Sequence, residues 1–339
     1  MFVKRNILNK VTSTISYVIY LGMVVILFDV VIMHELLGFG YPSHYEQENI
    51  FRYPAPYVEF TGKPYTKGHN EYGFRGSSFK ESKPSDLKVA FFGGSTGYWG
   101  NPSIAKIVEK ELEKLLGDSV FVANYSVISS NHRQHLHGII EYLPNFKPDL
   151  VVFYGGYNET VQSAIYDPRP GYPFNYFYRS ETSPFIKLLL ENSAILGEID
   201  EQFGVFTGIN KLREMQRPYS DSWNTRIANN YFETLFLANK VTNTIYSRRF
   251  GQAKFLAFYQ PYQVPIEFLS KHYDIKKHIH NHEYVFDVSS EYDSLGKDIY
   301  SDIVHVNQQA RDSMGVRLAN IITDVIRERG WLTTAKSDY

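Results

Sequence analysis

A serine between glycines is the residue of this sequence best suited to nucleophilic chemistry. Ser95 stands in the run Gly93-Gly94-Ser95-Thr96-Gly97, directly after a short apolar stretch. Glycines on both sides let the backbone turn sharply, which exposes the serine hydroxyl and leaves its N–H pointing at a developing oxyanion. The alternative is a phosphate-binding glycine turn, but the lysine of a P-loop and the spaced glycines of a dinucleotide fingerprint are both missing.

A second pattern near the C-terminus supplies a base for this serine. Asp302-Ile303-Val304-His305 comes directly before a stretch of helical spacing. A carboxylate three residues before a histidine can accept the imidazole Nδ1–H, so that Nε2 faces a serine hydroxyl. The alternative is an Asp and a His that merely cap the following helix. Together the two patterns predict a triad with Ser95 as nucleophile, His305 as base and Asp302 as its orienter.

Two further segments can supply donors to an oxyanion. Asn158 lies in Gly155-Gly156-Tyr157-Asn158-Glu159, and its side-chain amide suits this role, although Gly-Tyr-Asn is also ordinary turn chemistry. The run Asn124-Tyr125-Ser126-Val127 offers the N–H of Ser126. We predict an oxyanion hole made by Ser95 N–H, Ser126 N–H and Asn158, with Gly94 and Tyr157 contacting the substrate.

These segments need a scaffold that gathers strand ends, and the apolar pattern predicts one. Short apolar runs, typical of buried strands, alternate with stretches of helical spacing over 104–115, 223–246 and 310–325. The runs are Leu87 to Phe92, Val120 to Asn124, Leu150 to Tyr154, Lys254 to Tyr259 and Tyr284 to Val288. This succession predicts a three-layer α/β/α sandwich around a five-stranded parallel sheet, with its chemistry at the carboxyl ends of the strands.

The first forty residues predict a membrane anchor. Lys4, Arg5 and Lys10 precede an apolar stretch from Ile15 to Met33, close to the roughly 20 residues of a spanning helix. Asp29 is costly there, but it lies toward the outer end of the stretch. No small-residue cleavage site follows, so we expect an uncleaved anchor with a cytoplasmic N-terminus and the rest of the chain outside. The alternative is a buried amphipathic helix of a soluble protein.

Composition narrows the partners and the domain plan. With 35 Lys and Arg against 36 Asp and Glu, the charge does not suggest nucleic acid as a partner, and the absence of cysteine excludes thiol catalysis. We expect an anchor over 1–37, a Pro- and Tyr-rich lead-in segment over 38–85, and a catalytic domain over 86–332. An insertion over 162–251, with an aromatic run from Tyr166 to Tyr178, interrupts that domain.

Two histidine clusters have the spacing of metal ligands. They are His132, His135 and His137, and His278, His280 and His282. No acidic or thiolate partner completes either set in the sequence, so we expect no metal site and no cofactor.

Taken in order, the four segments resemble the blocks of the SGNH/GDSL hydrolases over about residues 69 to 330. The blocks of serine, glycine, asparagine and Asp-x-x-His match 93–97, 124–127, 156–159 and 302–305. The run Asn70-Glu71-Tyr72-Gly73-Phe74-Arg75-Gly76 also resembles a stretch that precedes the serine block in bacterial members associated with polysaccharide synthesis. Two departures stand out. Gly94 replaces the Asp of Gly-Asp-Ser, and Ser126 stands where the family has its oxyanion glycine, which suggests a weakened or re-specialised oxyanion hole.

The resemblance implies a flavodoxin-like sheet and acyl-ester chemistry outside the cytoplasm. The reaction is then either hydrolysis, such as deacetylation of a cell-surface glycan, or O-acyl transfer to a glycan hydroxyl. A third alternative, prompted by Ser126 and the aromatic insertion, is a catalytically silent membrane-tethered protein that binds glycan or joins polysaccharide-assembly proteins. The sequence does not choose among these.

Overall fold

The computed structural model describes residues 2–37, 50–162, 186, 193–203, 205, 221–263 and 275–331. The chain divides into two compact units. The smaller combines Met1–Glu48 with Tyr178–Met215, and the larger combines Asn49–Phe177 with Gln216–Tyr339. Residues 49–85 of the predicted lead-in segment fall in the larger unit. The domain bounds given above stay a prediction. The aromatic run over 166–178 lies outside the described residues.

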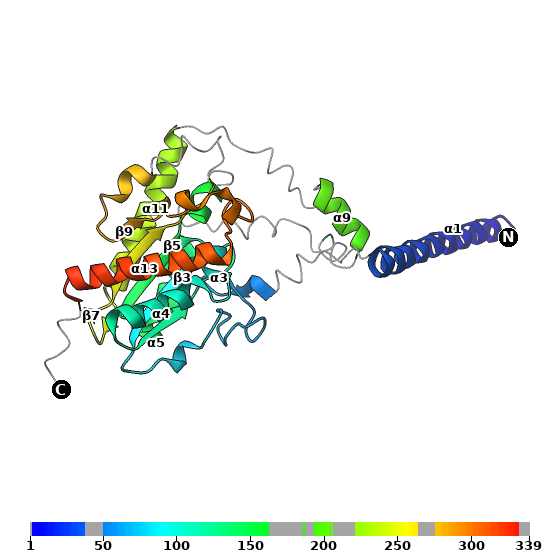
Figure 1. Cartoon of the computed structure of the whole chain (residues 1–339). Helices are drawn as coiled ribbons and strands as arrows, with labels where there is room; N and C mark the ends of the chain where they lie inside the picture. The colour runs from blue at the N-terminus through cyan, green and yellow to red at the C-terminus, as the bar shows by residue number, and fades with distance from the viewer. Residues whose placement is uncertain are drawn as a thin grey trace. The chain divides into compact units, whose positions relative to one another are not determined.

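A five-stranded parallel sheet forms the centre of the larger unit, as predicted (Figure 1). Its strands are β3 (Leu87–Gly93), β4 (Val120–Asn124), β5 (Leu150–Gly155), β8 (Lys254–Tyr259) and β9 (Val285–Asp287). The strand order is β4-β3-β5-β8-β9, and every pairing is parallel. The chain moves outward from β3 to β4 and then returns to the other side of β3 for β5. The carboxyl ends of β3 and β5 therefore flank the switch point, where open α/β sheets bind their ligands.

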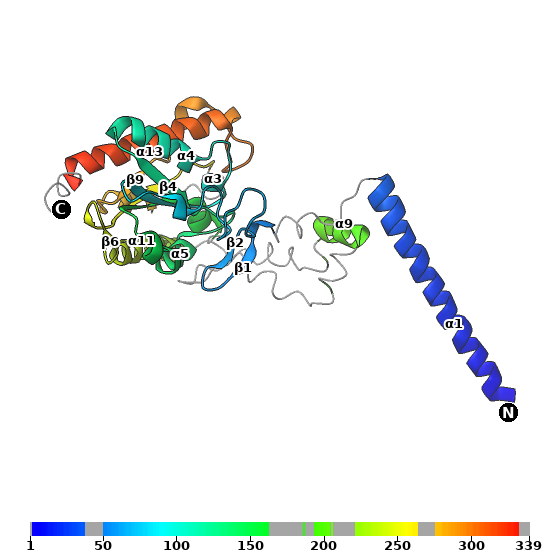
Figure 2. The ribbon, with the colours of Figure 1, turned by 90° about the horizontal axis from the view of Figure 1, so that it is seen from below.

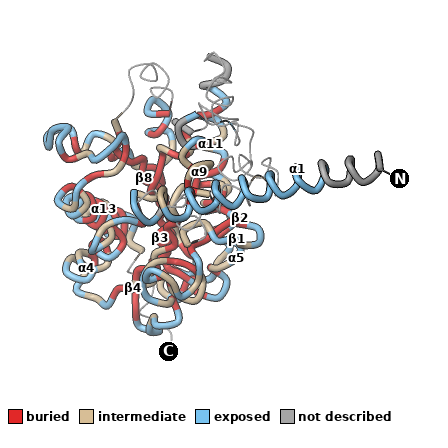
Figure 3. The backbone as a smooth tube through the Cα atoms, turned by 90° about the vertical axis from the view of Figure 1, so that its right-hand side faces the viewer, coloured by how far each residue is buried: buried red, intermediate tan, exposed pale blue. Residues whose placement is uncertain are grey.

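Helices cover both faces of the sheet (Figure 2). On one face α4 (Ile104–Leu116) packs against α13 (Gln308–Glu328), and on the other α5 (His132–Phe146) packs against α11 (Asp221–Thr242). Alternate residues of β3 enter different cores: Phe91 lies with the α4 and α13 side chains, whereas Phe92 lies with those of α5 and α11. Because both faces are buried, the strands are continuous apolar runs (Figure 3).

Two helices differ from expectation. The helix predicted over 223–246 ends at Thr242, because Tyr246 enters a small hairpin with Gln252. Helix α5 was not predicted, since its first turn carries the polar residues His132 and His135, which are buried here rather than exposed. A capping box between Asn131 and Gln134 starts this helix.

The short elements complete the described part. The strands are β1 (Tyr53–Ala55), β2 (Glu59–Thr61), β6 (Tyr246–Ser247) and β7 (Gly251–Gln252). The short helices are η2 (Phe79–Glu81), α3 (Ser95–Tyr98), η3 (Asn158–Gln162), η5 (Asp293–Leu295) and η6 (Lys297–Ile299).

The residues before β3 brace the turn that carries Ser95. The Asn70 side-chain oxygen accepts from the N–H groups of Tyr72 and Phe74, which fixes a tight turn. Arg75 then donates to the carbonyl of Tyr98, the last residue of α3, at 2.6 Å. This packing is the physical reason why residues 49–85 belong with the sheet.

In the smaller unit, α1 (Phe2–Leu27) continues into the π-helix η1 (Phe28–Leu36). The stretch Val11–Met33, which covers parts of both helices, is long and apolar enough to cross a membrane. A membrane anchor and a signal sequence both fit this description. Asp29 is buried, and its carboxylate accepts from the N–H of Ile195 at 2.9 Å, in the first turn of α9 (Ala194–Phe203). First-turn N–H groups have no intrahelical partner, so the carboxylate that counts against a spanning helix has a donor of its own.

Candidate active site

The structure links the three predicted triad residues by two hydrogen bonds. Ser95 begins α3 directly after β3, and His305 lies on the loop before α13. The Nε2 atom of His305 lies 2.8 Å from Ser95 Oγ, and its Nδ1 atom lies 2.6 Å from Asp302 Oδ2. This is the order that transfer of a proton from the hydroxyl to the imidazole requires.

Asp302 organises its own loop. Its Oδ1 atom accepts from the N–H groups of Val304 at 2.8 Å and His305 at 2.7 Å, while Oδ2 takes the imidazole. Burial alone would raise the pKa of Asp302, but the hydrogen bonds from His305 and Val304 outweigh it, and the pKa is lowered. Asn307 caps α13 by accepting from Ala310 N–H, so Asp302 and His305 are not the cap of that helix.

The glycines around Ser95 are required by close approaches. A Cβ atom on Gly94 would lie 2.7 Å from Asn158 Nδ2, and one on Gly97 would lie 2.5 Å from Ser126 Oγ. Only glycine therefore lets the Asn158 amide approach the nucleophile turn. The N–H of Ser95, in the first turn of α3, has no intrahelical acceptor.

Asn158 is held beside this turn. Its Nδ2 atom donates to the carbonyl of Ser130 at 2.7 Å, and the residue is 9% exposed. An amide nitrogen has two hydrogens, so the second remains for the cavity that Asn158 lines together with Ser95.

Ser126 is placed differently from expectation. Its N–H donates to the side-chain oxygen of Asn124 at 3.0 Å, the residue is fully buried, and its side chain lies under the nucleophile turn near Gly97. The cause is a turn closed by the Asn124 side chain, which takes the N–H two residues on. The structure therefore does not bring this predicted donor to the cavity, where Ser130 lies instead.

A small cavity opens beside Ser95. Gly94 and Tyr157, predicted to contact the substrate, both line it, and their role in binding stays a prediction. Its lining residues are Gly94, Ser95, Thr96, Ser130, Gly155, Tyr157, Asn158, Glu159, Gln260 and Val304. Gln260, which accepts from the Thr96 hydroxyl at 2.9 Å, was not among the predicted site residues. Its place directly after β8, at a carboxyl strand end, was the available signal.

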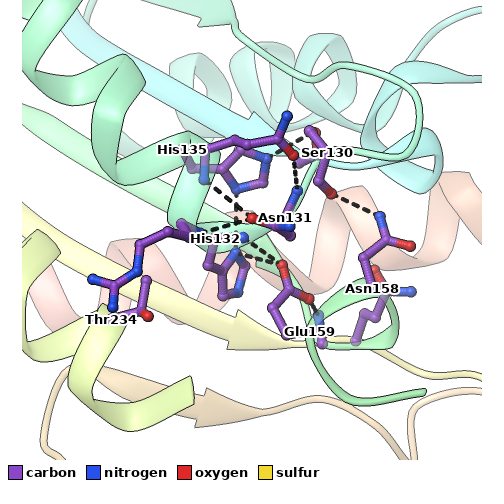
Figure 4. Close-up of polar contacts among 12 residues, drawn as sticks. Ser130, Asn131, His132, His135, Asn158, Glu159 and Thr234 are labelled. Atoms are coloured by element: carbon purple, nitrogen blue, oxygen red, sulfur yellow. Dashed lines mark hydrogen bonds and ion pairs between the residues drawn. The ribbon is translucent and has the colours of Figure 1, made fainter. Parts of the chain in front are cut away.

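The first histidine cluster has an acidic neighbour that the sequence did not reveal. Glu159 lies against His132 and His135, and one ligand atom from each of the three lies within 4.8 Å of the others (Figure 4). His137 is exposed on the same helix. In the second cluster His278 and His280 are exposed, and His282 stacks on Phe232.

No protein-family model matches the chain, and no curated protein matches its sequence. Solved structures to which it is similar include an acetyl xylan esterase, with 13% identity over 71% of this chain and 100% of that chain and a TM-score of 0.37. An acetylxylan esterase from Geobacillus stearothermophilus has 15% identity over 70% and 94%, with a TM-score of 0.38. A GDSL-like lipase from Bacteroides thetaiotaomicron has 12% identity over 70% and 89%, also with a TM-score of 0.38.

At these identities and scores the likeness adds nothing to the geometry of this chain's own residues. That geometry agrees with the fold that the resemblance to the SGNH/GDSL hydrolases implies: a five-stranded parallel sheet in the order β4-β3-β5-β8-β9, with helices on both faces.

Proposed function

We propose that this protein is a serine esterase that cleaves a short acyl ester through Ser95, His305 and Asp302. The observation that carries the proposal is the pair of hydrogen bonds that link the Asp302 carboxylate to the His305 imidazole and the imidazole to the Ser95 hydroxyl. They lie beside a cavity that Asn158 lines. A histidine that merely packed on the surface would not need both ring nitrogens engaged in this order.

The chemistry follows from the positions of these atoms. His305 Nε2 takes the hydroxyl proton as Ser95 Oγ attacks the ester carbonyl, and Asp302 stabilises the resulting imidazolium. The oxyanion accepts from Ser95 N–H and from the second amide hydrogen of Asn158. His305 then donates its proton to the leaving alcohol. In the second half of the reaction, His305 takes a proton from a water molecule, which attacks the acyl group on Ser95. The carboxylic acid leaves, and His305 returns the proton to the Ser95 oxygen.

Hydrolysis is favoured over acyl transfer by the exposure of the base. The side chains of His305 and Asp302 are 27% and 53% exposed. Transfer to a sugar hydroxyl requires that water be kept from the acyl-enzyme, and within the described residues the imidazole is only partly covered.

For the substrate we propose an acetylated glycan at the cell surface, with the acetyl group in the small cavity beside Ser95. The apolar stretch Val11–Met33 supports a place at the membrane. The basic residues before it, Lys4, Arg5 and Lys10, favour a cytoplasmic N-terminus and hence a catalytic domain on the outer side. Polysaccharide-assembly proteins are the partners that this location would offer.

The proposal is tested with the full chain purified in detergent and given 4-nitrophenyl acetate. We expect turnover that Ser95→Ala lowers by about 10³-fold or more, since the nucleophile is lost. Ser290→Ala, at an exposed serine, is the matched control and should leave turnover unchanged. Absence of Ser95-dependent turnover would favour the silent binding protein instead.

A further inference from the structure

Behind Asn158 lies a polar cluster of the buried residues Ser130, His132 and His135 with Glu159, whose side chain is 8% exposed, and the proposed reaction does not use it (Figure 4). His135 Nε2 lies 2.8 Å from Ser130 Oγ, and its Nδ1 lies 3.1 Å from His132 Nδ1. Both imidazoles are almost completely buried, at 3% exposure or less. Buried polar groups on this scale need a full set of partners, so their hydrogens can be assigned.

The Ser130 hydroxyl determines where the hydrogens of the two imidazoles lie. Its oxygen lies 3.0 Å from the carbonyl of Gly93 and 2.8 Å from that of Val127, and both contacts require the hydroxyl hydrogen. Ser130 Oγ must then accept from His135 Nε2. His135 Nδ1 is consequently an acceptor, and His132 Nδ1 carries the hydrogen that lies between the two rings.

Glu159 meets donors on both oxygens. Oε1 accepts from the backbone N–H of His132 at 2.6 Å and lies 3.2 Å from His132 Nδ1, and Oε2 accepts from Gly156 N–H at 2.8 Å. The carboxylate therefore joins the start of α5 to the turn that carries Asn158. Within the part of the chain that the structure describes, His132 Nε2 is the one nitrogen of the two rings that has no partner.

The same three side chains have the composition of a metal site, but the hydrogen assignment argues against one. A metal ion held between the two Nδ1 atoms, which lie 3.1 Å apart, would need the lone pairs of both. The His132 proton would then move to Nε2, where the described residues offer no acceptor. A buried N–H without an acceptor is more costly than an imidazole lone pair without a donor, so the hydrogen-bonded arrangement is preferred.

We infer that Glu159 and His135 are positioning residues for Asn158. This inference rests on the proposed function, because it assigns Asn158 to the oxyanion. Glu159 fixes the Gly156 end of the turn, while His135 fixes Ser130, whose carbonyl accepts from the Asn158 amide. The Ser130 hydroxyl also reaches Gly93, so the network joins the loops after β3, β4 and β5. It orients the second amide hydrogen toward the cavity before substrate arrives.

Glu159→Gln is the sharpest variant, because it keeps the size of the side chain and turns one acceptor into an NH₂ group that faces a backbone N–H. We expect kcat on 4-nitrophenyl acetate to fall about 10- to 100-fold with KM within about twofold, since misplacing a donor costs less than removing it. Glu141→Gln, at an exposed residue of α5, is the matched control and should change neither constant.

A double-mutant cycle separates positioning from general support of the fold. In an Asn158→Ala background, where the amide is gone, Glu159→Gln should change kcat by less than about twofold. An equal fold-loss in both backgrounds would overturn the inference, as would one equivalent of bound zinc in the purified protein or loss of turnover in EDTA.

His135→Gln covers the case in which Glu159→Gln fails to fold. Its amide can still donate to Ser130, so it should retain more kcat than His135→Ala, and equal losses would contradict the inference. If wild-type protein shows no Ser95-dependent turnover, the proposed function fails on that result alone. A crystal structure of Glu159→Gln would then still show whether the Asn158 amide loses its hydrogen bond to the Ser130 carbonyl. An amide that keeps its position would contradict the positioning role.

Discussion

At the scale of single residues, two buried histidines make the stability of the protein depend on pH. Burial lowers the pKa of both His132 and His135 to about 3, from an ordinary value of 6.5. Between those pH values the unfolded chain binds protons that the folded chain does not. The free energy of unfolding therefore falls as the pH is lowered through this window, by up to about 1.4 kcal/mol per pH unit for each histidine.

Glu159 opposes this trend in part. Burial raises the pKa of Glu159, so above 4.5 the unfolded chain releases a proton that the folded chain tends to keep. We expect two histidines to outweigh one carboxyl between pH 5 and 6.5. Urea unfolding at pH 5.5 and 6.5 should show a smaller decline for His135→Gln than for wild type, and the same decline for His280→Gln at an exposed histidine. Equal declines in all three proteins would show that His135 does not resist protonation.

Ser126 gives a second test at this scale. Because its N–H is taken by Asn124, and its hydroxyl is buried without a hydrogen-bond partner in the described structure, Ser126→Ala should change kcat by less than about twofold. Asn158→Ala should lower kcat by about 10² to 10³ through loss of a donor. Steady-state kinetics of Asn158→Ala test the amide donor, whereas Ser126→Ala keeps the backbone N–H and tests only the Ser126 hydroxyl. A large loss in Ser126→Ala would show that this hydroxyl supports the site.

The triad could be predicted from the sequence, but which residue after β4 lies at the cavity could not. Ser95 and the Asp302-x-x-His305 turn follow from residue type and spacing, because a glycine-flanked turn and an Asp-closed loop are built by neighbouring residues. Which residue after β4 reaches the cavity depends instead on how the chain turns over 124–130, where Ser129 adopts a φ of 65°. No spacing rule predicts a positive φ at a serine.

At the scale of elements, the strands were predictable and α5 was not. A strand buried on both faces is a continuous apolar run in the sequence, such as Leu150 to Tyr154, and can be recognised without knowledge of its neighbours. Helix α5 has no clear sequence signal, because its polar first turn is buried by distant partners. The rings of His132 and His135 pack on Phe153 of β5, and that of His135 also on Phe92 of β3. The Gln134 side chain donates to the carbonyl of Val58 in the lead-in segment. Those partners are distant in sequence, so the polar turn was interpreted as surface.

The brace before β3 makes a prediction about α3. The Arg75 guanidinium donates to the Tyr98 carbonyl at the end of the helix that Ser95 begins. A charged donor to a half-buried carbonyl contributes about 1.5 to 3 kcal/mol, so Arg75→Ala should lower the free energy of unfolding by that amount. It should also lower kcat more than KM changes, because α3 carries the nucleophile. Chemical denaturation and kinetics check both effects, with Arg248→Ala, which removes an exposed hydrogen bond to the Pro84 carbonyl, as the control. An unchanged kcat would show that α3 keeps its geometry without the brace.

At the scale of the whole molecule, the proposed catalytic residues and the apolar helix belong to different units. Ser95, Asp302 and His305 lie in the unit of Asn49–Phe177 and Gln216–Tyr339, whereas Val11–Met33 lies in the other. Each unit makes most of its contacts within itself, so the proposed esterase activity should not need the helix. A chain that begins at Asn49 should keep kcat within about threefold of the full chain and no longer sediment with membranes.

The same truncation should weaken α9. Removing Asp29 takes away the acceptor of the Ile195 N–H, and a first-turn donor that loses its partner weakens a helix by about 1 kcal/mol. Limited proteolysis should therefore cut the truncated chain near residues 194–203 faster than the full chain, while the sheet stays intact. Asp29→Ala in the full chain should reproduce the faster cutting with no loss of kcat, because it removes the same acceptor and leaves the apolar helix. If kcat fell with Asp29→Ala, the two units would be coupled, and the membrane segment would have to be counted as part of the enzyme rather than as its tether.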